Sequence, residues 1–334
     1  MGTHRTPTGR TMSSEAPLAT VELPFGSGDG ACAAAFDGRL HLFVVDGARS
    51  AHASIDASGR ASEYSCDVAF AVVDAAASGD GLVLVGDIDE GHLVVAALDA
   101  DGRERWRHAL DAASPLLHAP FVRACGDRVT VAWEEERGDA SVLAWCDVDA
   151  DGATPVQRIP LDDTTLRLAA TAIDDGLVVA RLAGMPPRAM LLRIVGGAVV
   201  AQREVSDACN GPIALARDGD GIALAGCDDA HLVVSRFDAK LTPLGPARTV
   251  AATKIDRLGA FDGGHAVFVG TRWPTKPAVH GIVPADGASA RVFIAQRASE
   301  LPQPVGRVEA GGWIGDRFVL VHGDDILAAS VFAG

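Results

Sequence analysis

Residues 81–102 read GLVLVGDIDEGHLVVAALDADG, and this stretch decides the fold. A turn at Asp80 and Gly81 precedes one apolar run, a polar loop follows, and a second apolar run ends in the turn at residues 99–102. Asp/Gly pairs between apolar runs are typical of tight hairpin turns, because glycine tolerates the positive φ that these turns need. The stretch therefore predicts two antiparallel strands with further strands on either side.

The same pattern recurs along the whole chain. The second residue of each Asp/Gly or Gly/Asp pair stands at positions 38, 81, 127, 176, 221, 263 and 316. The mean spacing is about 46 residues, a period typical of four-stranded propeller blades. Turns like the one at residues 99–102 alternate with these pairs, as in HASIDASG (52–59) and VLAWCDVDADG (142–152). Each unit thus predicts four antiparallel strands.

The predicted fold is all-β: a seven-bladed β-propeller of four-stranded antiparallel blades. Runs of small residues before the Asp/Gly turns, such as ACAAAF (31–36), are predicted to be the innermost strands, where the backbones crowd around an axis. The strand PLATVELPF (17–25) belongs to no complete unit, so we expect it to complete the last blade and close the ring. Residues 1–16 are predicted to be a disordered leader and residues 17–334 a single propeller domain.

Composition excludes several classes of protein. Hydrophobic residues make up 48% of the 334 residues and charged residues 22%, the balance of a folded soluble protein. The formal net charge of −15 argues against nucleic acid and anionic membranes as partners. No segment is apolar and long enough for a secretory signal or a membrane span, so we expect a cytoplasmic protein. We also expect a monomer. The six cysteines show no CxxC spacing and are expected to be free thiols.

The loops predicted between the second and third strands of the units are acidic. In a propeller these loops share one end of the ring, so their carboxylates would focus a negative potential there. Such a rim would hold a basic peptide, a protein or a small cationic ligand; the alternative is ordinary solvated loop charge. The carboxylates are Asp87, Asp89, Glu90, Glu134, Glu135, Glu136, Asp228, Asp229, Asp324 and Asp325.

Histidines are predicted near the same rim. His92 and His231 share one position in their repeats, His52 and His280 share another, and His322 falls in the last loop. Imidazole beside carboxylate is what a transition-metal site or an acid/base pair requires, so His92, His231 and His280 are candidate metal ligands. Inheritance from one duplicated blade explains the same recurrence. A divalent cation is the only cofactor that these residues suggest.

Two further patterns have competing interpretations. Asp147, Asp149, Asp151 and Gly152 match the first half of a calcium loop, but Pro155 and Arg158 occupy later ligand positions, which favours a plain hairpin turn. The loop TRWPTKPAVH (271–280) offers Arg272 and Trp273, residue types enriched in interfaces. Packing of Trp273 over a blade edge is the alternative.

Two segments resemble known bacterial propeller repeats. VVSRFDAKLTPLGPARTV (233–250) resembles blades of large bacterial propeller proteins, and LVVAALDADGRERW (93–106) is similar to quinoprotein-like and delta-60-like repeats. The resemblance spans residues 17–334 and implies the propeller fold, but such repeats occur in proteins of many activities.

Three functional hypotheses follow. The first is a non-catalytic binding scaffold that uses the acidic rim, with Arg272 and Trp273. The second is a metal-dependent lyase or hydrolase at the same rim, somewhat as in streptogramin lyase-like propellers. The third is a sugar-binding propeller with an aromatic residue between each pair of blades, which five Trp and one Tyr at irregular spacing disfavour.

Overall fold

The computed structural model describes fifteen stretches of the chain. Within them no helix has the length and apolarity that a membrane span requires. The described stretches are residues 17–23, 30–79, 81–87, 92–112, 116–137, 140–161, 165–205, 211–227, 231–251, 257–261, 266–270, 279–284, 291–294, 308–323 and 326–333.

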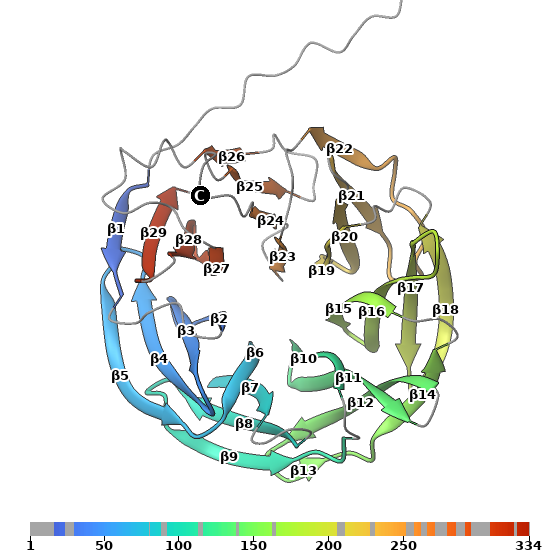
Figure 1. Ribbon diagram of the computed structural model, residues 1–334, viewed down its shortest axis with the longest axis horizontal. Coiled ribbons are helices and arrows are strands. Elements are labelled where there is room, and N and C mark those ends of the chain that lie inside the picture. Colours follow the sequence, from blue (N-terminus) through green and yellow to red (C-terminus); the bar gives the residue numbers. More distant parts are fainter. Residues whose placement is uncertain are drawn as a thin grey trace, which may run out of the picture.

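The described residues form seven antiparallel sheets that are arranged in a ring around a central axis (Figure 1). We number these blades in chain order. Blade 1 contains β2 (Gly30–Phe36), β3 (Arg39–Asp46), β4 (Arg49–Asp56) and β5 (Ala61–Val68); blade 2 contains β6 (Ala71–Ser78), β7 (Gly81–Asp87), β8 (Leu93–Asp99) and β9 (Glu104–Ala109). Blade 3 contains β10 (Leu116–Cys125), β11 (Arg128–Arg137), β12 (Ala140–Asp149), β13 (Gly152–Ala153) and β14 (Gln157–Leu161).

The remaining blades complete the ring. Blade 4 contains β15 (Thr165–Ile173), β16 (Gly176–Ala183), β17 (Arg188–Val195) and β18 (Ala198–Val205); blade 5 contains β19 (Ile213–Asp218), β20 (Gly221–Cys227), β21 (His231–Phe237) and β22 (Arg248–Ala251). Blade 6 contains β23 (Arg257–Phe261), β24 (Ala266–Gly270), β25 (Val279–Pro284) and β26 (Arg291–Ile294). Blade 7 contains β27 (Val308–Ile314), β28 (Arg317–His322), β29 (Ala328–Ala333) and β1 (Ala19–Glu22).

The prediction of uniformly four-stranded blades was wrong. Blade 3 has five strands, because its outer edge is split: β13 pairs with β12 at Val148, and β14 pairs with the same strand again from Trp145 onward. Pro155 lies between the two short strands and has no N–H to donate to a ladder, which accounts for the interruption. Side-chain burial is described for six of the blades, and blade 6 is described by its backbone pairing alone.

The strand that precedes each Asp/Gly turn lies innermost, as predicted. These strands are the inner edges of their sheets, and consecutive ones contact each other around the axis from β27 through β2, β6, β10, β15 and β19 to β23 (Figure 1). Strand β2 has the sequence GACAAAF, and its small side chains permit this crowding. The inner wall of the ring is therefore built largely from backbone and short side chains.

The hydrophobic core is divided into layers between neighbouring blades. In blade 1, for example, Leu40 and Leu42 pack with Val319 of blade 7, whereas Phe43 packs with Leu82 of blade 2. Successive residues of a strand point to opposite faces, so a strand covered on both sides must be apolar almost throughout. This explains the continuous apolar runs of the repeat.

The N-terminal strand closes the ring. Strand β1 pairs antiparallel with β29, and the N–H of Leu18 donates to the carbonyl of Val331 at 2.7 Å. Leu23 is buried, and its N–H donates to the carbonyl of Leu327 at 2.7 Å. The predicted completion of the last blade by the first strand is confirmed. This pairing also covers the outer edge of β29.

Candidate functional site

Two carboxylates of the predicted acidic rim are in the interior. Glu134 and Glu135 are completely buried within β11, so their placement in an exposed loop was wrong. Glu135 accepts hydrogen bonds from Arg137 Nε at 2.6 Å, Arg158 Nε at 2.8 Å and Trp133 Nε1 at 2.7 Å. Glu134 accepts a hydrogen bond from the Ser141 hydroxyl. These bonds replace the lost hydration of the two carboxylates, which are structural parts of blade 3.

The other rim candidates are only partly described. Glu136, near the end of β11, is exposed, and Asp87, at the end of β7, is half-buried. Both lie at the end of the ring that was predicted to be acidic. Of the remaining candidates, these lie outside the described residues: Asp89, Glu90, Asp228, Asp229, Arg272, Trp273, Asp324 and Asp325.

The histidines whose side chains are described do not form one group. His92 is exposed just before β8, whereas His231 and His280 lie in β21 and β25 with side chains outside the described set. His322 was predicted in a loop, which was wrong: it is buried at the end of β28 and lies 2.8 Å through Nε2 from the Ser330 hydroxyl. The described part of the chain contains no cluster of three or more potential metal ligands.

The calcium-like sequence forms a hairpin turn. One carboxylate oxygen of Asp149 accepts hydrogen bonds from the backbone N–H groups of Asp151 and Gly152, at 2.8 and 3.1 Å. Asp56, Asp99 and Asp238 accept backbone hydrogen bonds in equivalent turns. These Asp side chains stabilise the turns locally, as Asx turns do.

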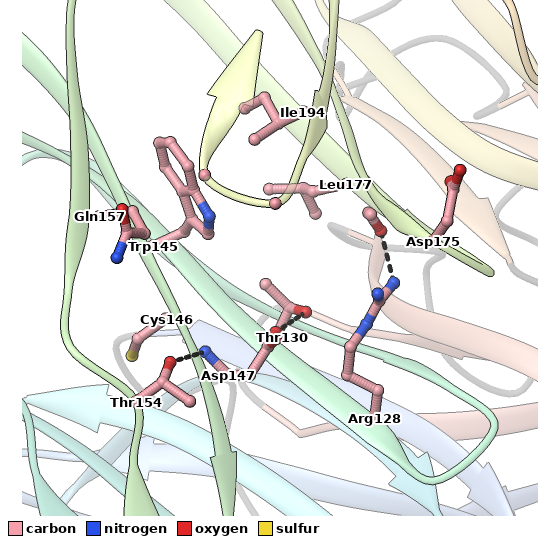
Figure 2. A pocket seen from close by; sticks show the side chains of 13 residues that line it. Arg128, Thr130, Trp145, Cys146, Asp147, Thr154, Gln157, Asp175, Leu177 and Ile194 are labelled. Carbon is pink, nitrogen blue, oxygen red and sulfur yellow. Dashed lines mark hydrogen bonds between the residues drawn. The ribbon is translucent and has the colours of Figure 1, made fainter. Parts of the chain in front are cut away.

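A polar hollow lies between blades 3 and 4, at the end of the ring opposite the predicted rim (Figure 2). Its volume is about 250 Å³. Blade 3 contributes mainly polar side chains and a tryptophan, and blade 4 contributes turn residues and two apolar side chains. The blade 3 residues that matter here are Arg128, Thr130, Trp145, Asp147, Thr154 and Gln157; those of blade 4 are Asp175, Leu177, Ile194, Gly196 and Gly197.

Hydrogen bonds fix the polar side chains of this hollow. The Thr130 hydroxyl donates to Asp147 Oδ1 at 2.6 Å, and the Asp147 N–H donates to the Thr154 hydroxyl at 3.0 Å. Arg128 Nη2 crosses to blade 4 and donates to the carbonyls of Ile173 and Gly176. Figure 2 shows the Thr130–Asp147 and Asp147–Thr154 hydrogen bonds and one of the two hydrogen bonds of Arg128. The site is therefore preorganised, because its side chains are held before any ligand arrives.

The hollow combines opposite charges with an apolar wall. Asp175 lies on the blade 4 side, where its Oδ2 accepts a hydrogen bond from Arg193 at 2.5 Å. Trp145 is largely buried, and Figure 2 shows its indole nitrogen turned toward the hollow. Leu177 and Ile194 face it from blade 4. A compact polar molecule with one apolar face matches this combination.

A second hollow of about 190 Å³ occupies the equivalent place between blades 2 and 3. Asp127 is in the same turn of blade 3 as Asp175 is in blade 4, and the cross-strand pair Val129 and Val148 corresponds to Leu177 and Ile194. Trp106 and Arg105 of β9 line this second hollow. The repeat thus places a hollow at two equivalent interfaces, but the tryptophan and the arginine come from different strands. They are Trp145 of β12 and Arg128 of β11 in the first hollow, and Trp106 and Arg105 of β9 in the second.

Sequence reasoning missed these residues as a site. Asp147 was noticed only as part of the calcium-like sequence, and Trp145 only as part of a strand. The signal that could have found them is the position of Trp in a blade together with a polar residue two positions later, as at Trp145 and Asp147. Without the blade interface, however, nothing in the sequence connects them with Asp175.

Comparison with known proteins identifies only the fold. No protein-family model and no curated protein sequence matches the chain. The structure of BBS1N in complex with ARL6DN has a TM-score of 0.60 at 13% identity, covering 96% of this chain and 97% of that one. The polysaccharide lyase Uly1 has a TM-score of 0.54 at 7% identity, covering 99% and 94%.

A fungal lectin from Aleuria aurantia is also similar. Its structure, described as a six-bladed β-propeller with a novel fucose recognition mode, has a TM-score of 0.51 at 12% identity and covers 78% of this chain and 93% of that one. These likenesses establish the β-propeller fold. The predicted resemblance is confirmed at that level, and its bacterial repeat subfamilies find no support.

Proposed function

We propose that this protein is a non-catalytic binding propeller that holds a small polar ligand in the hollow between blades 3 and 4. The single observation that carries the proposal is the hydrogen-bonded network that fixes Arg128, Thr130 and Asp147 around the hollow between blades 3 and 4. A solvent-filled gap between blades needs no fixed network of charged and aromatic side chains. A binding site does, because side chains ordered in advance lose less entropy when the ligand binds.

Similar folds bind ligands or partners in other proteins. The lectin mentioned above is described as recognising fucose, and BBS1N was solved in complex with ARL6DN. The propeller fold is therefore compatible with binding of ligands or protein partners, although a fold alone does not establish a function. The support specific to this chain comes from the hollow itself.

A thermal-shift screen with a library of small polar molecules tests the proposal. Thr154→Trp would fill the hollow from an exposed position. Gln202→Trp is the matched control: it adds the same side chain at an exposed position of β18 that does not line the hollow. We expect at least one compound to raise the Tm of the unaltered protein and of Gln202→Trp but not that of Thr154→Trp, because only a ligand of the native state stabilises it. A library in which every stabilising compound acts equally on both variants would contradict the proposal.

The acidic end of the ring is a second candidate, for a basic peptide or protein. It is favoured by the net charge of −15 and by the exposure of Glu136. Burial of Glu134 and Glu135 removes two of its expected charges. Binding of a fluorescent oligolysine peptide should weaken with salt and decrease in Glu136→Gln, since rim charges act mainly through long-range attraction. An equal affinity for the unaltered protein and this variant would count against the rim.

A further inference from the structure

We infer that the hollow between blades 3 and 4 takes a neutral, polyhydroxylated ligand of the size of a monosaccharide. This inference rests on the proposed function, because it assigns a chemical class to the ligand of the same hollow. It depends on two properties of the hollow: hydrogen-bond acceptors and donors in the same small space, and an apolar wall.

The acceptors come from both blades. Asp147 uses Oδ1 for the Thr130 hydroxyl, and Asp175 uses Oδ2 for Arg193. Each carboxylate therefore has a second oxygen whose hydrogen bonds are not used by these contacts. Because an ionised carboxylate only accepts, each of these second oxygens can take a hydrogen bond from a hydroxyl group of the ligand. Two such acceptors on facing blades can grip hydroxyl groups from opposite sides.

Donors lie beside these acceptors. Arg128 binds the blade 4 carbonyls through Nη2, so its guanidinium brings a positive charge and further N–H donors to the hollow. Gln157 donates to the Pro155 carbonyl at 3.1 Å and has a second donor on the same nitrogen. The Trp145 indole N–H adds a neutral donor.

This mixture disfavours charged ligands. A cation attracted by Asp147 and Asp175 would also lie near Arg128, and an anion attracted by Arg128 would also lie near the carboxylates, so repulsion cancels part of each attraction. A hydroxyl group both donates and accepts, and several hydroxyls on one small ring can satisfy both kinds of partner. The chemistry of the hollow therefore matches a neutral polyol better than an amine or a phosphate.

The shape of the hollow supports the same class. Trp145, Leu177 and Ile194 form an apolar wall that can cover the C–H face of a sugar ring. Opposite Gln157, the turn at Gly196 and Gly197 has positive φ values of 56° and 83°. A Cβ added at Gly197 would lie 2.9 Å from the Gln157 side-chain oxygen. Glycine at this turn thus lets the Gln157 side chain pack directly against the backbone at the edge of the hollow.

Saturation-transfer NMR with three probe classes tests the inference. The probes are methyl glycosides of common neutral hexoses and deoxyhexoses, N-acetyl-lysine amide as a cation, and inorganic phosphate as an anion. We expect at least one glycoside to bind with a Kd of about 1 mM, the affinity that ligand efficiency allows for a ligand of this size. Asp147→Asn, which preserves shape, should weaken that binding about tenfold through the loss of a charge-assisted hydrogen bond. Asp46→Asn, at the exposed end of β3 in blade 1, is the matched control and should leave the binding unchanged.

The outcomes separate this inference from the proposed function. Glycoside binding that is weakened by Asp147→Asn and abolished by Thr154→Trp supports both. Binding of the lysine amide or phosphate instead, with the same sensitivity to Thr154→Trp, overturns the inference and leaves the binding propeller intact. Absence of glycoside binding by a protein that passes the library screen also overturns the inference. If Asp147→Asn lowers the Tm substantially, Gln157→Ala at an exposed position replaces it as the probe of the hollow.

Discussion

His41 Nδ1 lies 3.1 Å from His52 Nε2, between two adjacent strands of blade 1. Both histidines are buried, and Phe43 stacks on His52 with ring centroids 4.8 Å apart. Desolvation by burial lowers the pKa of His52 to about 3, with a smaller contribution from neighbouring His41, and burial likewise lowers the pKa of His41. The described charged groups that affect His41 are Arg39, which lowers its pKa, and Asp37, which raises it.

The histidine pair should make the protein sensitive to acid. Below pH 6.5 the unfolded chain binds protons that the folded pair does not, so the stability present above pH 6.5 falls as pH falls toward 3. At pH 4, His52 alone corresponds to a loss of about 3 kcal/mol. Urea unfolding at several pH values from 8 to 4 measures how steeply the free energy of unfolding depends on pH. His52→Gln should flatten this dependence, whereas His92→Gln, at an exposed site, should not; equal slopes in both variants would refute the assignment.

An ion pair between blades 2 and 3 should stabilise the inner ring. Arg123 contacts Asp74 and also donates to the Ala170 carbonyl of blade 4 at 2.7 Å, while Asp74 accepts the Val122 N–H at 3.0 Å. Asp74→Ala removes all the hydrogen bonds that this carboxylate accepts and should lower the free energy of unfolding by about 2 kcal/mol. Chemical denaturation measures the change. The exposed Asp46→Ala should be close to neutral, and a similar small effect at Asp74 would show that the pair is dispensable.

Substitutions of two adjacent glutamates in β11 should have very different effects on the free energy of unfolding. Glu135→Gln removes a buried charge that accepts hydrogen bonds from Arg137, Arg158 and Trp133. It should cost about 3 kcal/mol, because the two guanidinium groups lose their counter-charge. Glu136→Gln, one residue later and exposed, should change the free energy of unfolding little. If the two variants unfold at the same urea concentration, the network around Glu135 does not stabilise blade 3.

Closure of the ring should depend on the buried leucine that directly follows β1. Leu23 is 3% exposed and packs in the layer between blades 7 and 1, whereas Leu18 is 58% exposed. Leu23→Ala should lower stability by about 3 kcal/mol, the usual cost of removing a buried leucine side chain. Leu18→Ala should have little effect. Differential scanning calorimetry of both variants measures this contrast, and equal Tm values would mean that the first strand contributes no packing.

The sequence predicted the propeller from local signals. Asp/Gly turns fix where hairpins form, and the continuous apolar runs between them require strands covered on both faces. Small residues such as those of β2 predicted the innermost strands, and an unmatched first strand predicted closure by β1. These features depend on residues close together in the chain, so they can be read without knowing how distant units meet. The split outer edge of blade 3 is the exception, although Pro155 marks it.

Only the tertiary structure decided where the charges lie and which of them meet. Glu134 and Glu135 were predicted on a surface because they stand in a charged run, yet Arg158 from another strand of blade 3 neutralises Glu135 inside it. Asp147 and Asp175 belong to different blades and become neighbours of one hollow only when those blades pack. Turn formation and strand periodicity depend on local sequence. Burial of charge and assembly of a site depend on contacts between residues that are distant in the chain, and for that reason the sequence alone did not reveal the hollow.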